Sequence, residues 1–280
     1  MNNPIGVLIN YAGQADIADR FRKAQAMGMT SCQLCIWNEK YYGAEYAASV
    51  KAAMEETGFR VSTVWAGWSG PCEWNAYYGP STIGLVPPAY RESRVKALIA
   101  GSDFAAAIGV PYVATHVGFL PADPYDPKFV DTVGALRHVC KYMQQRGQTF
   151  LFETGQETPM TIVRAIEAIG TGNCGINFDT ANLILYGNGN SLDAVGMFGK
   201  YIRDTHIKDG FYPEDGFHNG RQMPVGEGCA NIPAIIKKLR EIGYEGAFTI
   251  EREISGEQQE KDIAKARELI LEWIAEADNA

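Results

Sequence analysis

Short apolar segments alternate with longer amphipathic ones along the whole chain. The apolar segments are rich in Ile, Val, Leu and Phe, which is typical of strands buried on both faces of a parallel sheet. The pattern predicts eight strands, at Gly6–Ala12, Ser31–Trp37, Arg60–Ala66, Tyr112–Gly118, Thr149–Thr154, Gly175–Thr180, Ile202–Lys208 and Ala247–Glu251. The amphipathic segments predict a helix between successive strands and another after the last one.

The two amphipathic segments nearest the end of the chain each carry a single apolar stripe. In the first, apolar residues recur at the spacing of one helix face, at Ile232, Ile235, Ile236 and Leu239. The second repeats this spacing with Ile263, Ala266, Ile270 and Trp273. Asn231 stands just before the first stripe and is expected to cap that helix. Both segments are therefore predicted to be helices that pack on a sheet.

Eight successive strand–helix units favour a closed barrel over an open sheet. Chains of about 250 residues commonly fold this way as one α/β domain, and this chain has 280 residues. An open doubly wound sheet would bind a nucleotide at a glycine-rich first turn, and Tyr11–Gln14 contains no such motif. We therefore expect a single (β/α)8 barrel domain that spans residues 1–280.

Two connections are longer than the others. Gly67–Pro88 follows the third strand, and Phe211–Ala230 follows the seventh. Long loops in compact domains commonly form walls or lids of binding sites. Aromatic residues gather at the first loop, with Trp65 just before it and Trp68, Trp74, Tyr77 and Tyr78 within it. Such side chains suit either the C–H faces of a sugar or a contact between subunits.

Charge and composition exclude several classes of protein. The formal net charge is −8, whereas nucleic-acid binders usually carry a basic surface for the phosphate backbone. No apolar run approaches the roughly 20 residues of a membrane span. The N-terminus lacks the features of a signal peptide, so we expect a cytoplasmic protein. Cys32 and Cys35 lie within one predicted strand without a second Cys or His pair, so the cysteines are expected to be reduced and buried.

Four residues of the types that bind metals stand at the ends of four predicted strands. They are Glu153, Asp179, His206 and Glu251. The strand ends of a parallel barrel converge on one face, where three carboxylates and an imidazole would repel one another without a cation. Carboxylate oxygens with one imidazole favour Mn²⁺, Mg²⁺ or Co²⁺ over a thiolate zinc site. We expect one divalent cation, Mn²⁺ in the first place, with Mg²⁺, Co²⁺ or Zn²⁺ also compatible.

The segments around these residues resemble a known family. FETGQETP, NFDTANLILYG, HIKDG, PVGEG and GYEGAFTIERE are similar to segments of the xylose isomerase-like TIM barrel superfamily of sugar isomerases and epimerases. The resemblance covers nearly the whole chain and is densest from Glu153 to Glu253. It implies that Glu153, Asp179, His206 and Glu251 are metal ligands. It also implies that Glu153 and Glu251 are the catalytic acid/base pair.

The implied chemistry is proton transfer next to a carbonyl group. A ketose bound to the cation through its C2 carbonyl and C3 hydroxyl oxygens has a more acidic C3 proton and a stabilised cis-enediolate. One of the two glutamates would remove the proton and the other would return one to the opposite face. The resemblance therefore implies a ketose or ketose-phosphate 3-epimerase, or an aldose–ketose isomerase, with a small sugar or sugar phosphate as its partner.

Two basic residues near the ligands are further candidates for substrate binding. Arg221 matches an arginine with which the family contacts substrate oxygens, although loop arginines are mostly exposed. Lys208 follows His206 by two residues and therefore lies on the same face of the strand. It would either polarise a substrate oxygen or pair with an acid such as Asp179, and we favour the pairing. Glu157 stands at a helix start, where the helix dipole favours an acid.

Three uncharged or weakly basic residues complete the candidate site. His116, at the end of the fourth strand, would bind a hydroxyl group or serve a structural role, and Trp65 would contact the substrate. Free-sugar 3-epimerases of the family carry a histidine three residues after the metal-binding aspartate. The 5-phosphate 3-epimerases carry asparagine, and here that residue is Asn182. It can hydrogen-bond a hydroxyl but does not titrate, so phosphorylation of the substrate stays open.

Three other functions are compatible with the same residues. A dehydratase or lyase would form the same enolate and then expel a leaving group, which changes the mass of the product. A nuclease of this fold needs several metal ions, and the acidic charge with only four histidines argues against it. A non-catalytic sugar-binding barrel subunit would not need all four ligands. The aromatic loop and the habit of the family imply a homodimer or homotetramer.

Overall fold

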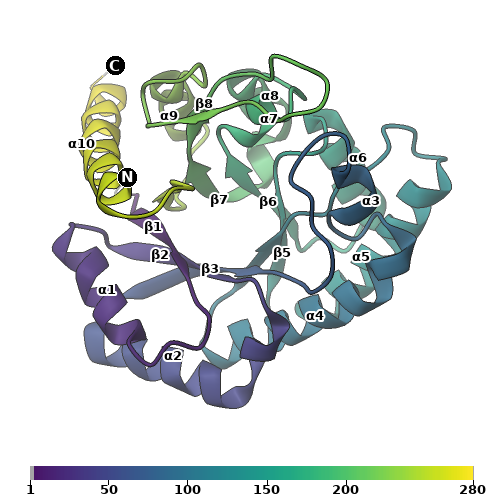
Figure 1. Ribbon diagram of the computed structural model, residues 1–280, viewed down its shortest axis with the longest axis horizontal. Coiled ribbons are helices and arrows are strands. Elements are labelled where there is room, and N and C mark those ends of the chain that lie inside the picture. Colours follow the sequence, from purple (N-terminus) through teal and green to yellow (C-terminus); the bar gives the residue numbers. More distant parts are fainter. Residues whose placement is uncertain (1–2, 280) are drawn as a thin grey trace.

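The structure, a computed structural model, describes residues 3–279 and contains a closed barrel of eight parallel strands (Figure 1). The strands follow the order β1-β10-β7-β6-β5-β4-β3-β2 around the barrel. Their bounds are β1 Ile5–Asn10, β2 Ser31–Ile36, β3 Arg60–Ala66, β4 Tyr112–Thr115, β5 Thr149–Glu153, β6 Cys174–Asp179, β7 Ile202–Ile207 and β10 Phe248–Ile250. The predicted (β/α)8 barrel is confirmed, and the fourth strand is shorter than predicted.

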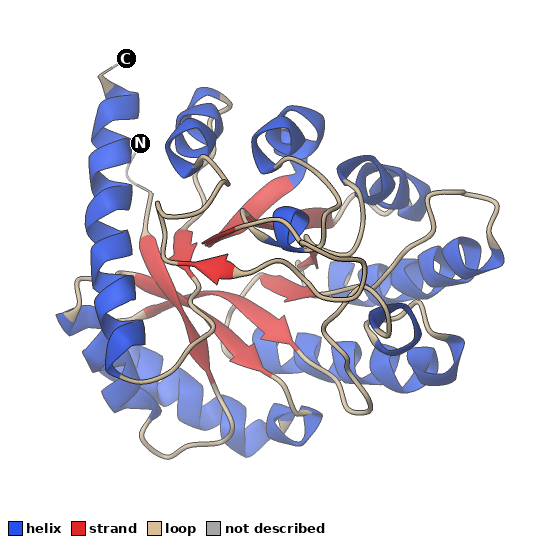
Figure 2. Cartoon of the chain, turned by 45° about the horizontal axis from the view of Figure 1, so that its top comes forward, coloured by secondary structure: helices blue, strands red, loops and turns tan. Residues whose placement is uncertain are grey.

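The helices surround the strands as an outer ring (Figure 2). They are α1 Ile17–Ala26, α2 Ala44–Thr57, α3 Gly79–Thr82, α4 Pro88–Ala107, α5 Pro127–Gln144, α6 Pro159–Ile169, α7 Asn182–Leu185, α8 Ser191–Phe198, α9 Ile232–Glu241 and α10 Glu257–Asp278, with 3-10 turns η1 Glu39–Tyr42 and η2 Gly199–Tyr201. None of the helices in this part of the chain has both the length and the apolar character needed to cross a membrane.

The predicted apolar stripes of α9 and α10 face the strands. All four stripe residues of α9 are buried, and in α10 Ile263, Ala266 and Ile270 are buried while Trp273 packs against the core. The prediction that the side chain of Asn231 caps α9 is wrong, although Asn231 is the residue before the helix. Asn231 precedes α9 but has a left-handed backbone with φ +57°, and its side chain accepts no hydrogen bond from the described helix.

Alternation along each strand separates two environments. In β5, Phe150 and Phe152 point to one side and contact each other at 5.2 Å between ring centroids, within the main apolar core. Glu153 points to the other side, toward the barrel interior, because successive side chains of a strand alternate. The interior is unusually polar at its centre, where Oγ1 of Thr63 donates a hydrogen bond to Oδ2 of Asp204 at 2.7 Å. Every carboxylate placed there therefore needs a partner.

One buried carboxylate holds both ends of the second long loop. The strands β8 Asp209–Gly210 and β9 Gln222–Met223 pair antiparallel, and Asp209 accepts backbone hydrogen bonds at 2.9–3.1 Å from Gly210, Gly226, Gly228 and Ala230. A Cβ atom at Gly228 would lie 2.2 Å from the Asp209 carboxylate. The PVGEG segment therefore needs glycine so that its backbone can approach this group.

The six cysteines are all free among the described residues. Cys32, Cys35, Cys140 and Cys174 are buried as expected. The expected burial is wrong for Cys229, which is exposed, and only partly right for Cys72, because both lie in the long loops rather than in strands.

Candidate metal centre

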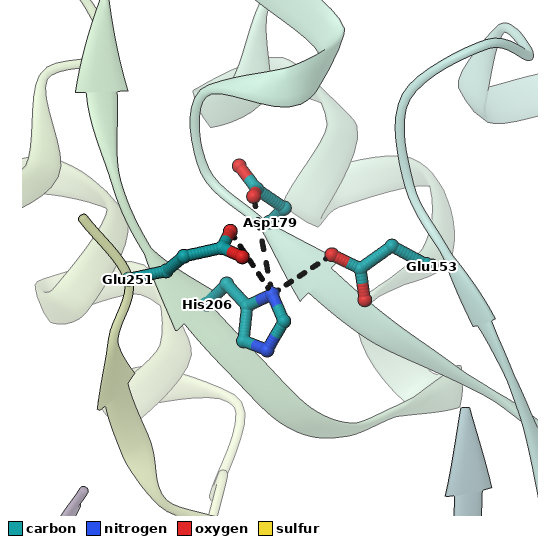
Figure 3. A group of neighbouring side chains, drawn as sticks. All are labelled: Glu153, Asp179, His206 and Glu251. Atoms are coloured by element: carbon teal, nitrogen blue, oxygen red, sulfur yellow. Dashed lines mark ion pairs between the residues drawn. The ribbon is translucent and has the colours of Figure 1, made fainter. Parts of the chain in front are cut away.

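The four predicted ligands come together at the carboxyl end of the barrel (Figure 3). Glu153 and Asp179 end β5 and β6, His206 lies one residue before the end of β7, and Glu251 follows β10 directly. Each residue offers one ligand atom, and these atoms all lie within 4.8 Å of one another. Because β5, β6, β7 and β10 are consecutive around the barrel, their ends surround one point.

The three carboxylates surround the imidazole of His206. Its Nδ1 atom lies 2.9 Å from Oε1 of Glu153, 3.4 Å from Oε2 of Glu251 and 4.0 Å from Oδ2 of Asp179. Figure 3 shows Glu153 and Glu251 on opposite sides of the ring. His206, Glu153 and Asp179 are buried, and Glu251 is only slightly exposed. The cluster is therefore a shielded set of three oxygen donors and one nitrogen donor.

Two of the ligand atoms are buried without a hydrogen bond in the described part of the chain, although each lies near a charged group of the site. Oδ2 of Asp179 and Nδ1 of His206 are buried and make no hydrogen bond to any described residue. Buried polar atoms are rarely left unpaired, and such atoms commonly contact an ion. Three carboxylate oxygens and one imidazole nitrogen are also the donors that Mn²⁺ or Mg²⁺ accepts. The residues present therefore fit a divalent cation.

Burial and mutual repulsion shift the pKa values of the cluster. Burial lowers the pKa of His206, but the nearby carboxylates of Glu153 and Glu251 outweigh it and raise the pKa well above its usual range. Burial raises the pKa of Asp179 to about 8, against the attraction of Lys208. Burial also raises the pKa of Glu251, but Lys208 and His206 outweigh it and hold the pKa well below its usual range. The protein itself thus neutralises much of the negative charge with protons, which a cation would replace.

A network of amides fixes the position of His206 from below. Nε2 of His206 lies 2.8 Å from Oε1 of Gln33, an acceptor, so this nitrogen carries the hydrogen. Nε2 of Gln33 donates to Oδ1 of Asn177 at 2.8 Å, and Nδ2 of Asn177 donates to Oε2 of Glu153. Because Nε2 keeps its hydrogen on Gln33, Nδ1 is the nitrogen that faces the carboxylates; it carries a proton while the imidazole is charged and would offer its lone pair to a cation. Gln33 and Asn177 thus orient two ligands.

Gln33 and Asn177 were not among the predicted site residues. A signal for both exists in the sequence, because each is a polar residue inside an otherwise apolar strand. Asn177 also precedes Asp179 by two residues and therefore points to the same side of β6.

Lys208 lies just above the cluster and pairs with acids, as predicted. Its Nζ atom is 3.6 Å from Oδ2 of Asp179, 3.2 Å from Oε2 of Glu251 and 3.0 Å from Oε2 of Glu253. It also donates to Oδ1 of Asn182 at 3.2 Å. Burial lowers the pKa of Lys208, but these carboxylates outweigh it and raise the pKa well above its usual range. Lys208 is therefore a cation fixed within an acidic site.

A cavity of about 490 Å³ connects the cluster to solvent. Of the predicted substrate-contacting residues, Trp65, His116, Asn182 and Lys208 line it. Burial lowers the pKa of His116 to about 4, so its imidazole is neutral at pH 7. Trp37 and Trp74 line the cavity as well, and Trp37 was not a predicted site residue. The cavity thus joins the ligands to an aromatic wall.

Two other predicted residues lie elsewhere. Arg221 is exposed, stands outside the lining of the cavity and has its guanidinium 5.7 Å from the ring centroid of Phe211. Glu157 precedes α6, as expected for an acid near a helix start, but its side chain is buried. It is 1% exposed, and both carboxylate oxygens lack a hydrogen-bond partner among the residues described. It does not line the cavity either.

A family model described as xylose isomerase-like TIM barrel matches residues 21–274. A xylose isomerase domain protein from Planctomyces limnophilus is 32% identical, with a TM-score of 0.92 and complete coverage of both chains. A xylose isomerase-like TIM barrel protein from Mycobacterium smegmatis, solved with magnesium, is 18% identical with a TM-score of 0.74 and covers 99% of this chain and 98% of its own. An uncharacterized protein of Methanocaldococcus jannaschii is 26% identical over 118 residues, which are 42% of this chain and 37% of that protein.

Enzymes with different activities share the fold. A 3-keto-D-glucoside 4-epimerase from E. coli has a TM-score of 0.71 at 18% identity and covers 97% of this chain and 100% of its own. An L-ribulose 3-epimerase has a TM-score of 0.75 at 16% identity. A protein from Bacillus anthracis described as a probable 3-DHS dehydratase has a TM-score of 0.68 at 14% identity. At these identities the likeness concerns the fold alone, so activity has to be argued from the site.

Proposed function

The chain belongs to the xylose isomerase-like TIM barrel family, and from this membership and its metal centre we propose that it is a divalent-metal-dependent sugar epimerase or isomerase. Its substrate would be a ketose or a ketose phosphate. The observation that carries the proposal is the convergence of Glu153, Asp179, His206 and Glu251 with their ligand atoms within 4.8 Å. Epimerases occur on the same fold, but the reaction class rests on the residues of this site.

The four ligands would hold the cation at the bottom of the cavity. When bound, a divalent cation polarises the carbonyl group of the substrate and stabilises negative charge on its oxygen. Gln33 would keep Nδ1 of His206 directed at the ion through the 2.8 Å contact at Nε2. Trp65 and His116 would close one side of the cavity and exclude water from the reacting carbon.

Glu153 and Glu251 would exchange protons with the carbon next to the carbonyl. They stand on opposite sides of His206 (Figure 3), so a sugar above the imidazole would present one face to each. One carboxylate takes the proton from the C–H bond, whose electron pair forms the cis-enediolate. The other glutamate, which must start in its protonated form, then gives its proton to the opposite face of the same carbon, which inverts that carbon. Lys208, 3.2 Å from Glu251, favours the carboxylate form of that residue.

NMR in D2O tests the proposal. The protein is incubated with a panel of ketoses and ketose 5-phosphates, once with added Mn²⁺ and once with a chelator. We expect deuterium to enter at the carbon next to the carbonyl only when the metal is present, with no other change in mass. Loss of water would instead assign a dehydratase, which this site could also support. Absence of exchange with every sugar, despite bound metal, would contradict the proposal.

A further inference from the structure

The wall opposite the metal ligands is built from aromatic rings in mutual contact. Ring centroids lie 4.5 Å apart for Trp37 and Trp65, and 5.7 Å apart for Trp37 and Trp74. The imidazole of His116 lies 5.8 Å from Trp65 and 5.2 Å from Trp74. Trp65 is buried, but Trp37 and Trp74 remain 43% and 38% exposed at the cavity. We call these four residues the aromatic wall.

The two long loops meet beside this wall and hold it in place. Tyr77 of the first loop contacts Phe217 of the second at 5.3 Å between ring centroids. Nδ2 of Asn219, which also lines the cavity, donates to the backbone oxygen of Trp74 at 3.0 Å. The exposed face of Trp74 is therefore supported from both loops rather than being a free side chain.

The basic side chains that line the cavity are already paired with other residues of the protein, so few groups are available to bind a phosphate. Among the described residues of the lining, the lysine and arginine side chains are Lys208 and Arg252. Lys208 is paired with Glu251 and Glu253, and Arg252 is paired with Asp262 at 2.7 Å and donates to Gln222 at 2.8 Å. A phosphate is bound best by arginine or lysine groups that can form charge-assisted hydrogen bonds to it. Here those groups already serve carboxylates.

We propose that the aromatic wall is a subsite for a second, uncharged ring, so that the substrate is a glycoside or disaccharide without phosphate. The reacting sugar would lie over the metal ligands, and the second ring would stack with its C–H face on Trp37 and Trp74. The cavity of about 490 Å³ reaches both places. This volume lies within the range of about 300–1,000 Å³ that is usual for pockets that bind small molecules. The proposal rests on the proposed function for the identity of the reacting end.

A matched set of ketoses tests the subsite by binding, which does not require turnover. The probes are D-fructose, D-fructose 6-phosphate, and fructose that carries glucose at oxygen 3, 4 or 6 (turanose, maltulose and isomaltulose). Kd values are measured by calorimetry on the Mn²⁺-loaded protein. We expect at least one disaccharide to bind about tenfold more tightly than fructose. Fructose 6-phosphate should bind no more tightly than fructose.

Variants locate the extra affinity. Trp74→Ala and Trp37→Ala should bring the ratio of the fructose and disaccharide Kd values to about one, and Trp74→Phe should restore part of it. Tyr125→Ala is the matched control, because Tyr125 is 88% exposed and does not line the cavity. It should leave the ratio unchanged.

Several outcomes would overturn the subsite. The first is a panel in which no disaccharide binds more tightly than fructose. The second is tight binding of fructose 6-phosphate that Arg221→Ala abolishes, which would assign a phosphate site to the loop. The third is a shift of oligomeric state in light scattering by Trp74→Ala without any change in the Kd ratio, which would make the wall a subunit contact. Deuterium exchange is recorded on the same samples. Binding of maltulose or isomaltulose, whose C3 hydroxyl group is free, without exchange would contradict the proposed function and leave the subsite standing.

Discussion

The two halves of the barrel's carboxyl edge differ in their chemistry. Strands β5, β6, β7 and β10 end in the metal-type ligands, whereas β2, β3 and β4 end beside the aromatic wall. One cavity touches both halves. The second half of the chain therefore supplies the carboxylates and the imidazole that could hold a cation, and the first half supplies a neutral, aromatic surface.

Under the proposed function, this division would separate the residues that react from those that recognise the substrate. Substitutions in the ligand half should change the rate of the chemical step, because they alter groups that act on the transition state. Substitutions in the aromatic wall should mainly change substrate affinity. The following predictions probe that division, beginning with the largest expected effect.

Replacement of Glu251 or Glu153 by Gln should nearly abolish activity. Glutamine has a similar shape but cannot accept the proton from carbon. We expect the rate at saturating substrate to fall by about 10²–10⁴-fold, as is typical for loss of a general base. The rate is measured by deuterium exchange, with bound metal checked by elemental analysis. If a metal-loaded Glu251→Gln variant kept more than about a tenth of the activity, Glu251 would not be a catalytic base and the proposed division between the two halves would be wrong.

Gln33 connects the two halves of the carboxyl edge. It lies on β2, beside the aromatic wall, but its side chain reaches across the barrel interior and contacts His206. Gln33→Ala removes the acceptor for the hydrogen on Nε2 of His206. We expect Mn²⁺ affinity to fall by about 10–100-fold, the usual effect of losing such an orienting residue. Calorimetry measures the affinity.

Thr63→Val is the control for Gln33→Ala. Thr63 is also buried in the barrel interior, but its hydrogen bond goes to Asp204 rather than to a ligand. It should lower stability without changing Mn²⁺ affinity. Equal losses of affinity in both variants would mean that Gln33 acts only through the stability of the barrel.

Glu157 tests whether every buried acid near the ends of β5, β6, β7 and β10 contributes to binding of the cation. Burial raises the pKa of Glu157 well above its usual range, against its own backbone N–H. An acid with a higher pKa in the folded chain binds more protons when folded, so the free energy of unfolding falls as the pH rises above about 4.3. Glu157→Gln should remove this decline.

The expected gain for Glu157→Gln at pH 7 is about 2–4 °C in Tm, which corresponds to roughly 1 kcal/mol in a chain of this size. Thermal unfolding at pH 5 and pH 7 measures it, and the gain should be larger at pH 7. Glu167→Gln is the control, because Glu167 is exposed and such changes stay within about 0.5 kcal/mol. A Glu157→Gln variant that lost Mn²⁺ affinity would show instead that this acid supports the metal centre.

The cluster of Glu153, Asp179, His206 and Glu251 can be predicted from the sequence, because closure of the barrel fixes the positions of the strand ends relative to one another. Once Glu153, Asp179 and His206 stand at the ends of neighbouring strands, hydrogen bonding between those strands brings them together. The local alternation of each strand also decides which residues point inward, and Asn177 was predictable on that ground. Gln33 was harder, because its partners are 144 and 173 residues away in the chain.

Loop residues were less predictable for a physical reason. The path of a long loop depends on contacts between distant segments, such as Tyr77 with Phe217, and not on a repeating pattern. The sequence therefore identified Arg221 as a candidate but could not show that it stands outside the cavity lining. The same limit applies to Trp37, whose place in the aromatic wall follows from its contacts with Trp65 and Trp74.

Asp209 has a consequence for how this scaffold can change over time. Its carboxylate binds the backbone on both sides of the 211–230 loop, at Gly210 and at Gly226, Gly228 and Ala230. Doubling the length of a flexible loop adds only about 0.6 kcal/mol of closure entropy. Insertions between Phe211 and Gly220 should therefore be tolerated without displacing His206. The loop can therefore change in length and sequence while the cluster of Glu153, Asp179, His206 and Glu251 keeps its arrangement.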